Sequence, residues 1–130
     1  HLIEPKLKIS GFDISSYALK HAHPDVKKNC RLFKHNAKKN FPFKNKSFDL
    51  VISLTTLHNL KLNNLKSTLK EISRVGKKSY ILVESFRNNK ELFNLQCWAL
   101  TCETFLSNDQ WVWFFDDSDF KGDYEFIYFK

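Results

Sequence analysis

The strongest constraint on the fold of this chain is a pair of short apolar runs that end among small or polar residues. One run is Phe48–Leu54, which two threonines follow, and the other is Leu7–Ile14, in which Asp13 stands near the end. A helical pattern comes after each run. Buried strands of parallel sheets read in this way, and their carboxyl ends open into a ligand crevice. The two runs therefore predict an α/β fold built on a parallel sheet.

The same alternation continues along the 130 residues, which suit a single domain over residues 1–130. Strands are expected over residues 7–14, 31–36, 48–54, 79–84 and 124–129. Helices are expected from Ser15 or Ser16 to residue 22, where His23-Pro24-Asp25 is a stop signal, from Asn63 or Asn64 to about residue 75, and after the Ser107-Asn108-Asp109 cluster. Residues 26–29 read as an irregular turn, and residues 88–106 begin as a helix and then stay open between helix and extended chain. The order β-α-β-β-α-β-α-β favours helical crossovers in a parallel sheet.

The net charge of +7 raises the question of a nucleic-acid surface. Lysine supplies 18 of the 21 basic residues, and asparagine is also frequent, with 11 residues. Both amino acids have A/T-rich codons, so a genome of low GC content accounts for the bias. The lysines are scattered, and arginine, which reads phosphates and base edges better, is rare. We therefore expect no nucleic-acid partner.

The sequence gives little indication of a membrane span, a metal site or a disulfide bond. No apolar run reaches the ~18 residues of a membrane span, and the N-terminus does not read as a signal peptide. The cysteines, Cys30, Cys97 and Cys102, are odd in number and lack a C-x-x-C pair. We expect free thiols in the cytoplasm, no membrane contact and no bound metal. Nothing in the sequence indicates the oligomeric state.

Five segments, taken in order, resemble the class I S-adenosylmethionine-dependent methyltransferases. They are Gly11-Phe12-Asp13-Ile14-Ser15, Asn36-Ala37 with Phe41-Pro42-Phe43, Ser47-Phe48-Asp49-Leu50-Val51-Ile52-Ser53, Leu57-His58-Asn59, and Leu69-Lys70-Glu71-Ile72-Ser73-Arg74-Val75. Their order and spacing are similar to those of family strands two to five. The segment from Trp98 to Tyr124 is similar to the C-terminal part of a bacterial subgroup. The resemblance implies a Rossmann-like sheet and methyl transfer from S-adenosylmethionine to a small-molecule acceptor.

The chain also departs from the pattern of that family. The first strand, the glycine-rich turn and the first helix are missing, and His1–Pro5 would be the tail of that helix. Asn36 stands where the family usually has Asp, and Gly76-Lys77-Lys78 replaces a Pro-Gly-Gly turn. We therefore expect an N-terminally incomplete domain that binds the cofactor weakly alone. The missing strand would lie between the strands at residues 7–14 and 48–54, so these two are expected not to pair directly.

The resemblance implies a cofactor site made of Asp13, Ile14, Asn36, Ala37, Ser53 and Leu54. Asp13 would hold both ribose hydroxyls through one carboxylate, and Ile14 would pack on the adenine face. The side-chain oxygen of Asn36 would accept from the exocyclic amine, and Ala37 would offer its backbone N–H to a ring nitrogen. Ser53 and Leu54 would line the methionine part. The structural alternatives are a helix-capping Asp13, a core Ile14 and a turn Asn36.

His58 is the candidate catalytic residue, because it follows the strand that ends at Leu54. A neutral imidazole there can take a proton from a hydroxyl or amine acceptor. The alternative is a histidine that packs or begins a helix. Methyl transfer from a sulfonium can depend largely on alignment and desolvation, so the function does not require a base. The aromatic residues Trp98, Phe105, Trp111 and Trp113 would cover an acceptor pocket or pack the core.

Two other functions stay open. The missing glycine-rich turn and Asn36 are compatible with a non-catalytic remnant or interaction module of the same fold. An acid at the end of a strand also suits a nicotinamide-dependent oxidoreductase, but the segments at residues 47–53 and 57–59 fit methyltransferases better.

Overall fold

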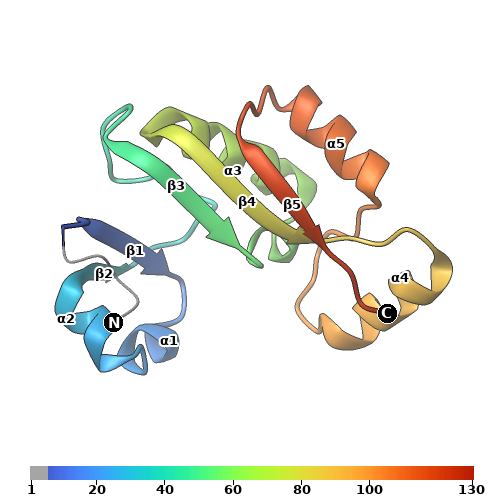
Figure 1. Cartoon of the computed structure of the whole chain (residues 1–130), viewed down its shortest axis with the longest axis horizontal. Coiled ribbons are helices and arrows are strands. Elements are labelled where there is room, and N and C mark those ends of the chain that lie inside the picture. Colours follow the sequence, from blue (N-terminus) through green and yellow to red (C-terminus); the bar gives the residue numbers. More distant parts are fainter. Residues whose placement is uncertain (1–5) are drawn as a thin grey trace. The chain divides into compact units, whose positions relative to one another are not determined.

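The strands of the computed structural model, which describes residues 6–130, form two parallel sheets (Figure 1). One sheet has the order β1-β2 and the other has the order β3-β4-β5, and all pairings are parallel. The chain divides into two compact units, one that ends at Lys39 and one from Asn40 to Lys130. The expectation of an α/β fold with parallel sheets is confirmed. The tail expected at His1–Pro5 lies outside the described residues.

The first unit is a β-α-α-β crossover. Its elements are β1 (Ile9–Asp13), α1 (Ser16–Lys20), α2 (Pro24–Asn29) and β2 (Cys30–Lys34). Ser15 caps α1 as expected, because its side-chain oxygen accepts from the backbone N–H of Ala18 at 3.1 Å. Both strands are shorter than the sequence suggested, and the helices follow β1 so that β2 returns parallel to it.

Helix α2 is a correction to the sequence reading, which placed an irregular turn at residues 26–29. Pro24 takes the first helical position, where its missing N–H leaves no intrahelical bond unmade. His23 caps the helix by accepting from the backbone N–H of Asp25 at 3.3 Å. The proline that was expected to stop one helix therefore begins the next.

The second unit carries the larger sheet. Its elements are β3 (Phe48–Leu54), the 3-10 turn η1 (Leu57–Asn59), α3 (Leu62–Val75), β4 (Gly76–Glu84), α4 (Asn89–Trp98), α5 (Asn108–Asp117) and β5 (Asp123–Ile127). Strand β3 has the predicted bounds, and Ser107 begins α5 with a capping box to Gln110. The open region at residues 88–106 is resolved as α4 followed by irregular chain.

The core of this unit lies between α3, α5 and one face of the sheet. Leu65, Leu69 and Ile72 recur at helical spacing on α3 and are fully or almost fully buried. Ile81 and Val83 are the buried residues of β4 that share that face. With 14 residues, α3 is the longest described helix, and within residues 6–130 no helix has the length and apolarity to span a membrane.

The opposite face of β3 is exposed, which corrects the expectation that this strand is fully buried. Leu50, Ile52 and Leu54 alternate along the strand and are 50%, 56% and 51% exposed. A doubly wound sheet needs cover on both faces, and α3 covers one face here. In this sheet β3 pairs with β4, and in the first unit β1 pairs with β2.

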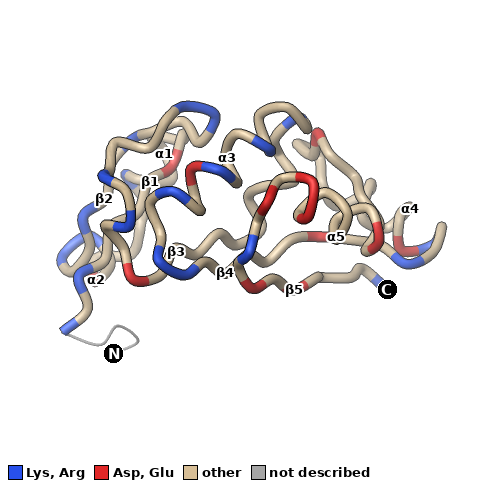
Figure 2. Tube along the Cα trace, turned by 90° about the horizontal axis from the view of Figure 1, so that it is seen from above, with Lys and Arg blue, Asp and Glu red and all other residues tan. Residues whose placement is uncertain are grey.

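Basic residues are distributed over many elements (Figure 2). Several are matched locally by acids: Lys66 contacts Asp117 at 2.6 Å, and Lys77 contacts Asp49 at 2.7 Å. The charge of the chain is therefore spread along both units and partly compensated, rather than collected on one helix or strand.

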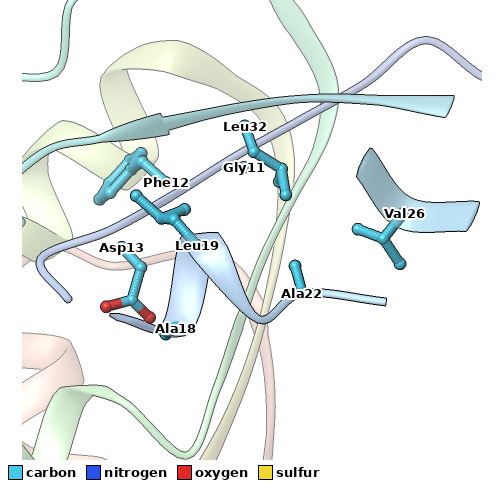
Figure 3. A pocket seen from close by; sticks show the side chains of 8 residues that line it. All are labelled: Gly11, Phe12, Asp13, Ala18, Leu19, Ala22, Val26 and Leu32. Atoms are coloured by element: carbon cyan, nitrogen blue, oxygen red, sulfur yellow. The ribbon is translucent and has the colours of Figure 1, made fainter. Parts of the chain in front are cut away.

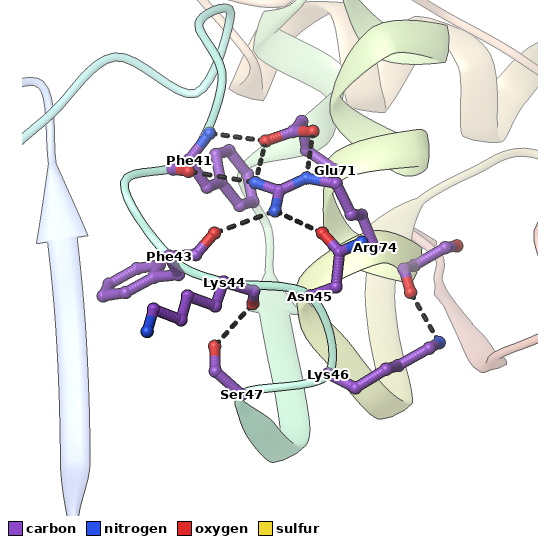
Figure 4. A network of polar contacts seen from close by, with 9 residues as sticks. Phe41, Phe43, Lys44, Asn45, Lys46, Ser47, Glu71 and Arg74 are labelled. Carbon is purple, nitrogen blue, oxygen red and sulfur yellow. Dashed lines mark hydrogen bonds and ion pairs between the residues drawn. The ribbon is translucent and has the colours of Figure 1, made fainter.

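The loop that leads into β3 is fastened by Arg74 on α3 (Figure 4). Its guanidinium donates to Glu71 through Nε and Nη2, both at 2.7 Å, and to the backbone oxygens of Phe43 at 2.8 Å and Phe41 at 3.0 Å. Glu71 in turn accepts from the backbone N–H of Phe41 at 2.5 Å. A planar fork of five donors suits this task, because several carbonyls are satisfied by one side chain.

We expect this network to make stability depend on pH. The hydrogen bond from Arg74 holds the pKa of the Glu71 carboxyl below its usual value of 4.5. A lowered pKa in the folded state means that the contribution is fully present above pH 4.5 and is lost as the pH falls further. Glu71→Gln should therefore be less stable than the native chain in urea at pH 7, and the gap should narrow at pH 3.

Asp49→Asn is the matched control for that measurement. Like Glu71, Asp49 pairs with a basic side chain, that of Lys77, but the side chain of Asp49 is 93% exposed. Water therefore screens the pair, and the loss of stability in Asp49→Asn should be small at both pH values. If Glu71→Gln were less stable than the native chain by the same amount at pH 7 and at pH 3, the ionised Glu71 carboxylate would not be the source of the stabilisation.

Candidate functional site

Asp13 is the last residue of β1 and is exposed at the carboxyl end of the strand. Its Oδ1 accepts from the backbone N–H of Ser15 at 2.7 Å. This bond orients the carboxylate at the start of α1 and uses one of its two oxygens. Asp13 is not the cap of this helix, because Ser15 is the N-cap of α1, and lone pairs on the carboxylate still remain for two hydroxyl donors.

The residues expected around the adenine lie at the same edge. The backbone N–H of His35 donates to the oxygen of Asp13 at 3.1 Å, which carries the β1-β2 pairing one residue beyond β2. Asn36 and Ala37 follow His35 directly in the sequence. The four predicted residues of the first unit thus lie at or shortly after the carboxyl ends of β1 and β2, which pair with each other.

Asn36 also forms a turn, as its structural alternative proposed. Its Oδ1 accepts from the backbone N–H of Lys38 at 3.0 Å, and its backbone oxygen accepts from Lys39 at 2.9 Å. An amide oxygen has two lone pairs, so this turn fixes the side chain and leaves capacity for a second donor. Ile14 is 59% exposed, so it is a surface residue and not a core residue.

A mostly apolar pocket adjoins Asp13 (Figure 3). It is lined by Gly11, Phe12, Asp13, Ala18, Leu19, Ala22, Val26 and Leu32. Figure 3 shows the Asp13 carboxylate at one end of this group and Val26 at the other. Of the predicted site residues, Asp13 lines this pocket, whereas Ile14, Asn36 and Ala37 do not.

The carboxyl end of β3 holds Ser53 and Leu54, followed by a strained residue. Thr55 has a φ of 48°, a left-handed conformation that is costly for a β-branched side chain, on the order of 1–3 kcal/mol. The backbone N–H of Thr55 donates to the oxygen of Leu82 at 2.8 Å, and this bond holds the turn against β4. Strain of this kind is retained at functional sites more often than elsewhere.

His58 lies in η1 just beyond this turn and is 4% exposed. Its Nδ1 makes an ion-pair contact with Oε2 of Glu84, the last residue of β4, which is 2% exposed. Although these two atoms are in contact, neither His58 Nδ1 nor either carboxylate oxygen of Glu84 has a hydrogen-bond partner of regular geometry in the part of the chain that the structure describes. The sequence analysis missed Glu84, although an acid at the carboxyl end of a strand was the signal that identified Asp13.

The backbone around His58 is fixed by the irregular segment after α4. The oxygen of His58 accepts from the backbone N–H groups of Glu103 at 2.9 Å and Thr104 at 3.1 Å. The hydroxyl of Thr104 donates to the oxygen of Leu60 at 2.6 Å. These hydrogen bonds hold η1 in place at His58 and at Leu60. They matter because a single 3-10 turn has little stability of its own.

Of the four expected aromatic residues, Trp98 lies beside His58. Its ring centroid is 6.2 Å from that of His58 and 4.6 Å from that of Phe129, and it is 52% exposed. Trp111 is fully buried and belongs to the core, whereas Trp113 is 65% exposed on the outer side of α5. An aromatic cover over an acceptor is thus compatible with Trp98 but not with Trp111.

The thiol of Cys102 is not poised as a nucleophile. Cys30, Cys97 and Cys102 are free thiols. Burial raises the pKa of the Cys102 thiol above its usual value of 9.0, so the thiol stays protonated at neutral pH. The reactive thiolate form is therefore disfavoured there.

Comparison with known proteins relates this geometry to one family. A sequence profile described as a methyltransferase domain matches residues 2–83, a segment that includes all the predicted site residues and ends one residue before Glu84. Among curated proteins, no sequence matches the chain.

Two solved structures share the fold. The YcgJ protein from Bacillus subtilis is 17% identical with a TM-score of 0.68, over 85% of this chain and 51% of that one. A chain in the complex between the Haloferax volcanii Trm112 methyltransferase activator and a protein described as a methyltransferase is 21% identical with a TM-score of 0.65, over 85% and 50%. The chain therefore spans about half the length of these structures.

Proposed function

The chain belongs to the methyltransferase domain family, and from this premise we propose that it takes part in S-adenosylmethionine-dependent methyl transfer to a small-molecule acceptor. The single observation that carries the proposal is the edge of the first sheet. There an oriented, exposed carboxylate at the end of β1 adjoins an exposed Ile14 and the turn at Asn36 and Ala37.

The residues of this edge fit the adenosine part of the cofactor. Asp13 would accept hydrogen bonds from both ribose hydroxyls, and Ile14 would cover one face of the adenine. Asn36 would accept from the exocyclic amine, and Ala37 would donate its backbone N–H to a ring nitrogen. An amide oxygen in place of the usual carboxylate makes that contact weaker, because charge-assisted hydrogen bonds are the stronger ones.

The end of β3 would serve the rest of the reaction. Ser53 and Leu54 would line the methionine part, and His58 would face the acceptor and take its proton. When bound, the cofactor supplies a methyl group on a positively charged sulfur, which leaves as a neutral thioether. The protein's task is then mainly to align the acceptor and exclude water.

The test is cofactor binding by Asp13→Asn and Asp13→Ala. We expect each to weaken S-adenosylmethionine binding by about 1–3 kcal/mol, or roughly 5- to 150-fold, because ribose hydroxyls lose a charged acceptor. Titration followed by the NMR shifts of the Ser15 and Ala37 amides measures weak binding and reports its place.

Asp25→Ala on α2 is the matched control, since it removes an exposed carboxylate from the same unit without touching the sheet edge. Its affinity should equal that of the native chain. Unchanged affinity in both Asp13 variants, or shifts that leave Ser15 and Ala37 unaffected, would refute the adenosine site.

A further inference from the structure

We infer that Glu84 is a positioning residue for His58: it holds the Nδ1–H of the imidazole and thereby presents Nε2 as the proton acceptor. The inference rests on the proposed function and deepens it, because it defines the acceptor class. A base held in this way serves an acceptor whose reacting atom carries a proton, on a hydroxyl or an amine nitrogen.

Burial is the first observation behind this assignment. A carboxylate that is 2% exposed is costly unless it is paired, and its contact here is with His58, which is 4% exposed. A buried ion pair adds little net stability compared with apolar residues of similar volume. Stability alone therefore gives no reason for an acid and an imidazole to share this site.

The orientation of the imidazole is the second observation. Nδ1 is the nitrogen directed at Glu84 Oε2, so Nε2 lies on the far side of the ring from the carboxylate. A partner on one ring nitrogen selects the tautomer and leaves the lone pair on the other. The neighbouring Trp98, whose ring centroid is 6.2 Å from that of His58, is half exposed.

Rigidity is the third observation. The oxygen of Glu84 accepts from Trp111 Nε1 at 3.1 Å, and the oxygen of His58 accepts from two backbone N–H groups of the segment after α4. The backbones of both residues are thus fixed from different elements. Such prior fixing is what an oriented base requires, because its geometry is set before the acceptor arrives.

The proton balance follows from this arrangement. The acceptor's O–H or N–H proton would pass to Nε2 as its oxygen or nitrogen takes the methyl group that a bound cofactor would supply from its sulfonium, which would leave as a neutral thioether. His58 becomes an imidazolium that the Glu84 carboxylate stabilises, and solvent later removes the proton.

The experiment reads the tautomer of His58 in the chain without cofactor. Long-range ¹H–¹⁵N correlation at pH 9 should show the Nδ1–H form in the native chain and mainly the Nε2–H form in Glu84→Leu. Glu91→Leu is the matched control, since Glu91 on α4 is another buried carboxylate, 4% exposed, and pairs with Arg87, which precedes that helix. It should leave the His58 tautomer unchanged.

A second measurement separates a base from a merely structural pair. Diethyl pyrocarbonate acylates an accessible imidazole lone pair, and peptide mass spectrometry compares His58 with the exposed His23 as an internal standard. His58 should react in the native chain, and its extent relative to His23 should fall in Glu84→Leu. If Glu84→Leu does not fold, the tautomer and the acylation of His58 in the native chain still test the inference.

Three outcomes would overturn the inference: an Nε2–H tautomer in the native chain, no acylation of His58, or the native tautomer retained in folded Glu84→Leu. None of these measurements needs the cofactor. Failure to bind S-adenosylmethionine would refute the proposed function and leave the tautomer result standing, so the two failures can be told apart.

Discussion

Trp111→Ala should lower the free energy of unfolding of the unit from Asn40 to Lys130 by about 3–5 kcal/mol, the range for removing a large aromatic side chain from a core. Trp111 is fully buried on α5, and its ring stacks on Phe115 with centroids 5.4 Å apart. The loss would be a large fraction of the ~5–15 kcal/mol that stabilises a typical domain. Urea unfolding followed by circular dichroism measures it.

The indole also holds the end of β4, because Nε1 donates to the backbone oxygen of Glu84 at 3.1 Å. Trp111→Phe keeps most of the buried ring but leaves that oxygen without its donor, so its loss should be smaller than that of alanine. Trp113→Ala on the same helix is the control: this side chain is 65% exposed and its removal should change stability by no more than about 0.5 kcal/mol. Equal losses at the two tryptophans would contradict the assigned core.

The sequence did not reveal which of the large apolar side chains are buried and which are exposed. Trp98, Trp111 and Trp113 look alike in the sequence, and only the packing of α5 distinguishes the buried one from the exposed ones. Strand β3 could be placed to the residue because a run of 7 residues that is rich in apolar side chains, too short for a typical helix and bounded by polar residues favours a strand. The exposure of one face of β3 could not be predicted. The sequence of a strand does not show whether helices cover both faces of its sheet or only one.

Some residues of the candidate site could be predicted from the sequence, and others could not. Asp13, Asn36 and His58 were identified through segments with recognisable order and spacing, and the structure places the first two at one sheet edge. Glu84 was missed because its partner is 26 residues away and no local pattern joins them. α2 was missed for a local reason, since Pro24 was taken as a stop signal and not as the first residue of a helix.

Leu57→Ala should cost the same unit about 2–5 kcal/mol, the range for Leu→Ala in a core. Leu57 is 1% exposed and Leu60 is 6% exposed, and these two side chains anchor η1 on either side of His58. A 3-10 turn of three residues has no stability of its own, so its position comes from this packing and from the clamp at Thr104. Differential unfolding in urea is the measurement.

Leu100→Ala is the control for that loss, because its side chain is 91% exposed and the change should stay within about 0.5 kcal/mol. Leu57→Met keeps the volume and should lose less than about 1.5 kcal/mol. If packing at Leu57 is what fixes the turn, the His58 imidazole should also lose its single tautomer in Leu57→Ala and keep it in Leu57→Met. A loss below about 1 kcal/mol, with the tautomer unchanged, would mean that the clamp from the segment after α4 holds His58 against Glu84 without help from this leucine.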